Sequence, residues 1–292
     1  MTAGPTLGAL LALGAALTWA LTSLLVRPML AHHGSVAINA TRTTAGGALL
    51  VGWVAATGSA ADVAGLSTPG LLLLVGSIVV AIGVGDTVFF ESTRMIGLGR
   101  AMTISMTYPV GAALLAAVAL REPVTLPVAA GTLLTLGGLV LIVGARAVGE
   151  PVARPDWWGI GAAALASLAW ALSVVMMKRP LDEVDPITAQ AIRLPLAGLM
   201  LWATPWARRA APGLRGGPVV ARLAVLSLLS AASSVMFVGG LKYAGVAVAA
   251  VLSSTAPLFA IPLGMIFLGE RLPARAVAGA AVTVTGIIVL RL

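Results

Sequence analysis

The sequence predicts an all-α integral membrane protein with ten transmembrane helices, arranged as two inverted five-helix repeats. Composition is the first observation behind this prediction. Of the 292 residues, 59% are hydrophobic and only 10% are charged, and the mean hydropathy is +1.04. In an average soluble domain about a quarter of the residues are charged. A bilayer span needs about 20 apolar residues, so the chain has room for roughly ten spans and for no soluble domain beside them.

Apolar runs long enough to cross a bilayer place the individual spans. The first run lacks the basic start of a signal peptide and is too long for a signal-peptide core, so it counts as a span. Turn residues such as Arg121-Glu122-Pro123 mark the ends of several runs. The predicted spans are residues 6–26, 36–56, 70–90, 99–120, 127–145, 157–177, 187–206, 219–240, 247–268 and 274–291.

A similarity between the two halves of the chain is the second observation. GALLALGAALTWAL, which begins at Gly8, matches GIGAAALASLAWAL, which begins at Gly159, and the match resumes later with an offset shorter by three residues. The matched pairs include Trp19 with Trp170, Asn39 with Gln190, Arg42 with Arg193, Pro109 with Pro257, Glu122 with Glu270, Gly131 with Gly279 and Gly138 with Gly286. Five spans is an odd number, so the second copy enters the membrane from the opposite side and the repeat is inverted. We therefore divide the chain into a first repeat at 1–145, a linker loop at 146–156 and a second repeat at 157–292.

The charged residues predict orientation and compartment. The net charge is +8, but the basic residues lie mainly in short segments between apolar runs, where they act as orientation signals and head-group contacts and do not indicate nucleic-acid binding. The face opposite the two termini carries more Lys and Arg, so we expect both termini outside the cytoplasm. The preference for Arg over Lys, with many Ala and Gly residues, suggests a bacterial protein, and hence a multi-pass protein of the cell inner membrane. Cysteine is absent, which excludes disulfides and thiolate metal sites.

The ends of the two halves share a pattern of a proline within a span, then a glutamate, then a glycine-bearing final span. Half one reads MTYPVGAALLAAVALREPVTLPVAAGTLLTLGGLVLIV from Met106, and half two reads STAPLFAIPLGMIFLGERLPARAVAGAAVTVTGIIVL from Ser254. This pattern resembles the EamA-type domain of the drug/metabolite transporter superfamily, over nearly the whole chain. The resemblance implies a ten-helix inverted repeat that moves amino acids, their derivatives, nucleotide-sugar-like compounds or other metabolites, commonly outward. It also implies that spans one, three, four, six, eight and nine line a central cavity.

Proline and arginine residues inside the spans are the first functional candidates. Pro109 and Pro257 each remove a backbone hydrogen bond, which favours a hinge facing the substrate; a kink satisfied by nearby Ser and Thr hydroxyls is the alternative. Arg42 and Arg193 lie roughly 10 Å into their spans, and each either binds a substrate carboxylate or phosphate or reaches back toward the head groups.

Two carboxylates near the end of the third span are candidates for proton coupling. Asp86 and Glu91 are replaced in half two by Ser234 and Gly239, so the repeat does not support a shared role. A static pair of Asp86 with Arg42, or a Glu91 already in water, is the alternative.

Aromatic and amide side chains complete the candidate site. Trp19 and Trp170 lie in mid-span and either line a cavity or fill the gap between the repeats, while Asn39 and Gln190 bind either the substrate or a neighbouring helix. The candidate substrate-binding residues are Trp19, Asn39, Arg42, Phe90, Tyr108, Trp170, Gln190, Arg193, Ser253 and Thr255; the hinge residues are Pro109 and Pro257; the proton-coupling residues are Asp86 and Glu91.

Two further sets of residues are interpreted as structural. Glu122 and Glu270 are expected to anchor at the interface or to cap the helix that follows each of them. The glycine stripes of the fifth and tenth spans are expected to allow close helix packing, with dimerisation as the alternative.

Together these features predict a secondary transporter of a small metabolite, first of all an exporter of an amino acid or derivative, working by alternating access at a midplane cavity. No GxxxxGK[ST] pattern is present, so ATP is not expected to drive it. The alternatives are an intramembrane enzyme acting on a lipid-linked substrate and a non-transporting scaffold. The only histidines are His32-His33, and neither an HExxH motif nor a thiol is present, so we expect no catalytic residue, metal or cofactor. The expected partners are the small-molecule substrate, the lipid bilayer and protons as coupling ion, with no nucleic acid and a monomer or homodimer as the assembly.

Overall fold

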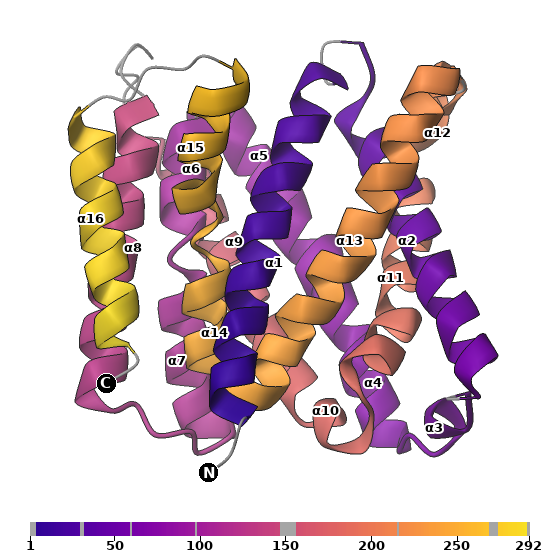
Figure 1. Ribbon diagram of the computed structural model, residues 1–292, viewed down its shortest axis with the longest axis horizontal. Coiled ribbons are helices and arrows are strands. Elements are labelled where there is room, and N and C mark those ends of the chain that lie inside the picture. Colours follow the sequence, from indigo (N-terminus) through magenta and orange to yellow (C-terminus); the bar gives the residue numbers. More distant parts are fainter. Residues whose placement is uncertain are drawn as a thin grey trace.

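The computed structural model describes residues 4–29, 32–58, 60–96, 98–146, 156–214, 216–268 and 274–290. These residues form helices and turns and no strand (Figure 1). The first half contains α1 (Gly4–Val26), η1 (Arg27–Met29), α2 (Ser35–Thr57), α3 (Ala60–Ala64), α4 (Thr68–Ile78), the π-helix η2 (Val79–Asp86), α5 (Thr87–Ile96), α6 (Leu98–Ser105), α7 (Tyr108–Ala119) and α8 (Leu126–Arg146). The second half contains α9 (Trp157–Lys178), α10 (Pro180–Glu183), α11 (Pro186–Trp202), α12 (Pro205–Ala210), η3 (Ala211–Leu214), α13 (Gly217–Ala244), α14 (Val246–Ser253), α15 (Ala256–Leu268) and α16 (Ala274–Val289).

Helices occupy all ten of the predicted ranges. Four of the ranges are interrupted: the third by η2, the fourth between α6 and α7, the seventh between α11 and α12, and the ninth between α14 and α15. Five helical stretches of the described chain are both long and apolar enough to cross a membrane: Gly4–Val26, Thr68–Phe89, Trp157–Glu183, Gly217–Ala244 and Val246–Phe267. Three more apolar helices are shorter: Tyr108–Ala119, Leu126–Ile142 and Ala274–Val289. The remaining two ranges are occupied by α2 and α11, which carry polar side chains that bind neighbouring helices.

The two termini lie at the same edge of the molecule in Figure 1, together with α3 and α10. Helix α1 starts at this edge, whereas α9, its counterpart in the second half, ends there beside α10. Corresponding helices of the two halves therefore run in opposite directions. At one end of the molecule α8 lies beside α16, and at the other end α2 packs against α11 and α13.

Glycine stripes join α8 to α16 at close range. A Cβ added at Gly131 would lie 2.8 Å from the Gly286 carbonyl oxygen, and one added at Gly279 would lie 2.7 Å from the Gly138 carbonyl oxygen. The second contact is the first with the halves exchanged. The stripes thus face each other within one chain, as expected for close packing, and their small residues are not left on the surface for a second copy.

The same exchange of halves relates the contact of α1 with α13 to the contact of α9 with α5, and it also holds between α2 and α11. A Cβ at Gly8 would lie 2.4 Å from Ala244 N, and one at Gly159 would lie 2.5 Å from Ile96 Cγ2. In the matching α2–α11 contacts, Gly47 faces Pro195 and Gly198 faces Thr44. Reciprocal contacts of this kind are those of a two-fold, isologous interface, here between two halves of one chain.

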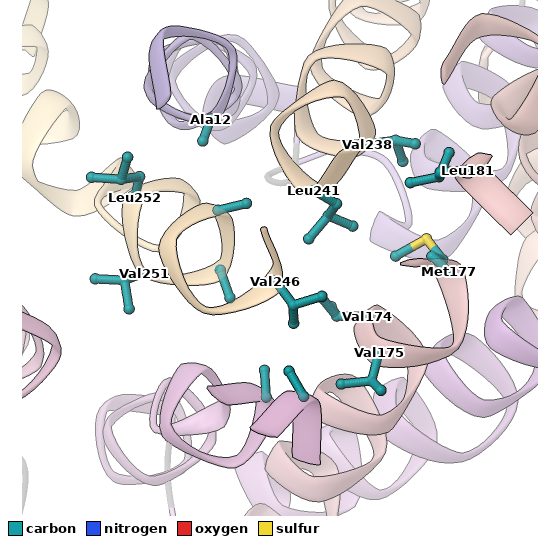
Figure 2. Packing of buried hydrophobic residues seen from close by; sticks show 14 of the residues in the cluster. Ala12, Val174, Val175, Met177, Leu181, Val238, Leu241, Val246, Val251 and Leu252 are labelled. Carbon is teal, nitrogen blue, oxygen red and sulfur yellow. The ribbon is translucent and has the colours of Figure 1, made fainter. Parts of the chain in front are cut away.

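The largest apolar cluster lies where the two halves meet. It includes Val174 of α9, Leu241 of α13 and Val246 of α14, which converge in Figure 2, together with Ala12 of α1 and Ala116 of α7. Many of its members are alanine or valine, and these small side chains allow the helix axes to approach closely.

A polar cluster at the edge that holds the termini fixes the start of α11. The Asp185 carboxylate accepts hydrogen bonds from the N–H groups of Ile187 (2.7 Å) and Thr188 (3.2 Å) and from the Thr188 hydroxyl. Burial tends to raise the pKa of Asp185, but these hydrogen bonds and the charge of Lys242 outweigh it, so the pKa lies below its usual value. Lys242 in turn donates to the Val184 carbonyl at 3.0 Å.

The glutamate that follows α7 caps a different helix from the one expected. Both carboxylate oxygens of Glu122 accept from the N–H of Val246, at 3.2 and 3.0 Å, so Glu122 caps α14 of the other half and not the next helix, α8. The chain reverses between α7 and α8, and Arg121 there has a positive φ of 56°, which places Glu122 beside the start of α14. Glu270 and most of the predicted linker at 146–156 lie outside the described residues.

We expect Gly138→Leu to destabilise the protein strongly, because a Cβ there would lie 2.5 Å from both the Gly279 carbonyl oxygen and Thr283 N. Overpacking of this kind costs about 1–3 kcal/mol or more. The neighbouring Gly137 has open space around it, which makes Gly137→Leu the matched control. Thermal unfolding in detergent should show a fall of several degrees for Gly138→Leu alone; equal unfolding temperatures for the two variants would contradict the α8–α16 contact.

The stability contributed by the Asp185 charge should depend on pH. Because its pKa is lower in the folded state, the contribution is complete above the ordinary Asp value of about 3.9 and is lost as the pH falls through the lower folded value. Asn caps helices about as well as Asp, so Asp185→Asn removes the charge while keeping a cap. The gap in unfolding temperature between wild type and Asp185→Asn should shrink on acidification, whereas Asp182→Asn, in the exposed part of α10, should show no such trend. A gap that stays constant with pH would refute the role of the charge.

Candidate functional site

Trp170, near the middle of α9, lies at the centre of a polar and aromatic cluster. Its indole Nε1–H donates to Asp86 Oδ1 at 3.0 Å. The Phe89 ring is tilted against the indole at a centroid distance of 5.3 Å, and the Tyr108 ring meets it edge to face at 6.4 Å. Both aromatic distances lie in the range of favourable ring contacts. The cluster therefore brings residues of the predicted third, fourth and sixth spans together.

A π-helix positions the carboxylate of this cluster. η2 ends at Asp86, and single π-turns inside helices are frequent at functional sites. The preceding residue, Gly85, lies directly against the indole, since a Cβ there would be 2.6 Å from Trp170 Nε1. Only glycine at this position lets the backbone approach closely enough for the hydrogen bond between Asp86 and Trp170.

Tyr108 extends the cluster to a further helix of the second half, α14. Its hydroxyl donates to the Ala250 carbonyl at 3.3 Å and lies 3.4 Å from the Ser253 hydroxyl, both in the last turn of α14. The contacts therefore run from Asp86 in the first half through Trp170 to Tyr108, and from there to α14. They form one continuous connection between the halves.

Two helix breaks flank this connection and have the same geometry. Thr107 N donates to the Ile104 carbonyl at 3.1 Å, and Thr255 N donates to the Leu252 carbonyl at 3.2 Å. The two threonine hydroxyls bond the same carbonyls at 2.7 and 2.6 Å. Pro109 and Pro257 each follow two residues later, as the second residue of α7 and α15, where their missing N–H groups are tolerated.

These breaks show a structural use for the hydroxyls, which bond carbonyls at the kinks. Ser254 does the same, donating to the Val251 carbonyl at 2.7 Å. Thr255 is fully enclosed at 0% exposure. A hinge role for Pro109 and Pro257 stays a prediction.

The two intramembrane arginines have matching partners. Arg42 Nε donates to Asn39 Oδ1 at 2.9 Å and its Nη1 donates to Ser230 Oγ of α13 at 3.0 Å. Arg193 Nη1 donates to Gln190 Oε1 at 3.3 Å and its Nε donates to Ser77 Oγ of α4 at 3.0 Å. Each arginine thus binds an amide three residues earlier in its own helix and a serine of the opposite half.

The amides differ in their further contacts. Gln190 Nε2 donates to the Ser234 carbonyl of α13 at 3.1 Å, which is the interhelical use considered for it, whereas the one bond described for the Asn39 side chain is to Arg42 of its own helix.

Several predicted residues lie apart from the central cluster. Arg42 is one of them: it bonds Ser230, and Asp86 bonds Trp170, so the alternative of a static Asp86–Arg42 pair does not hold. Trp19 is 56% exposed and makes no ring contact within the described chain. Glu91 is an exposed residue of α5, and the side chain of Phe90 lies outside the described part of the structure.

Four contributors were not predicted: Gly85, Phe89, Ser77 and Ser230. Phe89 had a signal, because Phe237 occupies the same place in the second half. The serines had none, because a serine in an apolar span bonds its own helix as readily as a neighbour.

Comparison with known proteins gives three findings. A sequence model described as the EamA-like transporter family matches residues 6–144 and again 157–292. A protein of Archaeoglobus fulgidus named "Uncharacterized transporter" is 27% identical over 221 residues, which is 76% of each chain. A solved structure, described only as the crystal structure of a protein, superposes with a TM-score of 0.79 at 22% identity over 97% of this chain and 94% of the other. That likeness shows the fold alone.

A double-mutant cycle should detect the bond between Trp170 and Asp86. Trp170→Phe keeps an aromatic ring but removes the donor, and hydrogen bonds to charged groups contribute about 1.5–3 kcal/mol. Combined with Asp86→Ala, it should show a coupling of about 1 kcal/mol or more in thermal or denaturant unfolding. Trp206→Phe, at a residue that is 68% exposed, serves as control and should be additive with Asp86→Ala. Additivity of Trp170→Phe with Asp86→Ala would contradict the contact.

Proposed function

The chain belongs to the EamA-like transporter family, and on that premise we propose that it is a secondary transporter of a small metabolite that works by alternating access between its two halves. Coarse features support the proposal: the described residues form helices and no strand, several of the helices are apolar and long enough to span a membrane, and the protein is a multi-pass membrane protein. The family and the transporter name of its relative favour transport over an intramembrane enzyme or a scaffold.

The proposed topology has ten spans, with the halves at 1–145 and 157–292 inverted in the membrane and joined by the 146–156 loop. The reciprocal glycine contacts support it, because an inverted repeat places equivalent helices about a two-fold axis in the membrane plane. The excess of basic residues on one face supports the placement of both termini outside the cytoplasm, in a bacterial inner membrane.

One observation carries the proposed mechanism: the connection from Asp86 through Trp170 and Tyr108 to α14, beside two broken helices. Substrate sites of inverted-repeat transporters lie at the repeat interface, next to interrupted helices. Movement of one half against the other must separate the Tyr108 hydroxyl from Ala250 and Ser253. A substrate bound there would therefore be coupled to the change of state, with the breaks before Pro109 and Pro257 as hinges.

Asp86 is the proposed coupling site for protons. It accepts one hydrogen bond from Trp170 and has no ion pair with a cation among the described residues. An ionisable residue inside a membrane span is by default a candidate for an ion or proton pathway. Glu91, exposed on the adjoining α5, would pass protons between the site and water.

Amino acids and their derivatives, moved outward, are the first substrate class to test. Thermal unfolding of purified protein against amino acids, nucleotides and sugars should reveal a stabilising ligand, and liposome uptake of that ligand should follow a pH gradient. Asp86→Asn should abolish the response to the gradient, while Asp182→Asn, at an exposed residue of α10, should retain it. Full pH-driven uptake by Asp86→Asn would refute the coupling role; protein that neither binds nor moves any compound of the panel would refute transport.

A further inference from the structure

Two guanidinium groups lie inside the bundle without a counter-charge among the described residues. By helical rise, Arg42 is about 10 Å beyond the start of α2. Neither Arg42 nor Arg193 forms an ion pair with any described carboxylate, and their partners are amide and hydroxyl oxygens. Asp86, the carboxylate considered as a partner of Arg42, is bonded to Trp170. Neutral partners orient a guanidinium but leave its charge uncompensated.

The donors left over on Arg42 form one edge of its fork. Nε and one N–H of Nη1 are used by Asn39 and Ser230, which leaves the second Nη1 N–H and both N–H groups of Nη2. Among the described residues, Thr135 Oγ1 is the one side-chain polar atom that is both fully buried and without a hydrogen-bond partner. Arg42 Nη2, for which no partner is described, is therefore not fully buried. This edge therefore keeps unused donors, and two hydrogen bonds on the other side of the guanidinium hold it in place.

The two arginines differ in exposure. Arg193 is only 5% exposed, whereas Arg42 is half-buried. Although both arginines bind an amide and a serine, Arg42 is the more accessible of the two in this conformation. The Arg42 site is also built across the halves, from α2 and from α13.

We propose that Arg42 binds the carboxylate of an organic-anion substrate, an assignment that rests on the proposed transport function. Two parallel N–H donors match the two oxygens of a carboxylate, and charge-assisted pairs of this kind are stronger than neutral hydrogen bonds. A bound carboxylate compensates the positive charge of Arg42, and the charge is uncompensated again once the substrate has left. A permanent internal ion pair could not do so. Because Ser230 belongs to the opposite half, relative movement of the halves changes the shape of the binding site.

The test compares carboxylates with neutral molecules of the same shape. The probes are acetate, benzoate and N-acetyl-L-leucine, each paired with its amide, measured by thermal unfolding and by liposome uptake at constant ionic strength. At least one acid should stabilise the wild type more than its amide does. In Arg42→Gln the affinity for that acid should fall about tenfold or more, and Arg42→Lys should recover part of it. Arg208→Gln, at an exposed arginine of α12 that donates to the Trp202 carbonyl, is the control and should bind as the wild type does.

The outcomes separate this assignment from the transport function. Uptake of the amides at the same rate as the acids would overturn the anion site and leave the transporter intact. Acid binding that survives in Arg42→Gln would overturn the site as well. The remaining outcome is that Arg42 binds lipid head groups. In that case anionic phosphatidylglycerol in nanodiscs would stabilise the wild type more than Arg42→Gln, whereas the acids would not. That result would overturn the proposal. Unfolding temperatures of the two Arg42 variants without ligand show whether they are folded.

Discussion

Close contact between helices of opposite halves, made possible by glycine, is the constraint on which the rest of this structure depends. Gly8, Gly47 and Gly131 each place a backbone against a helix of the other half, and Gly159, Gly198 and Gly279 repeat those contacts with the halves exchanged. In a bilayer, lipid tails are as apolar as leucine, so helices associate through close packing and hydrogen bonds and not through exclusion of water. The two-fold relation between the halves is thus held by backbone proximity.

The chemistry is found where the two halves differ. Trp170 bonds Asp86 and meets Tyr108, whereas the positions that correspond to Asp86 and Tyr108 in the second half are occupied by Ser234 and Ala256. The Ser234 hydroxyl bonds the Ala231 carbonyl of its own helix. The scaffold is therefore nearly symmetric, while Asp86 and Tyr108 have no ionisable or phenolic counterpart in the second half.

Hydroxyl groups account for most of the polar contacts between the spans. Ser92 and Ser105 donate to the carbonyls of Gly159 and Ala163 on α9, at 2.8 and 3.1 Å. Ser173 of α9 donates to the Ser77 carbonyl at 2.7 Å, and the Ser77 hydroxyl accepts from Arg193. Serine satisfies such contacts without adding charge to the membrane interior.

The sequence by itself determined the helical ranges, the internal repeat and the helix interruptions near Pro109 and Pro257, because apolar run length, residue identity and proline chemistry are local properties. It also paired Trp19 with Trp170, but could not tell that only Trp170 has a carboxylate partner. Which side chains meet depends on how each helix is rotated about its axis and on which neighbour it faces. Only the tertiary structure therefore joined Asp86 to Trp170 and not to Arg42, and set Glu122 on α14 of the other half.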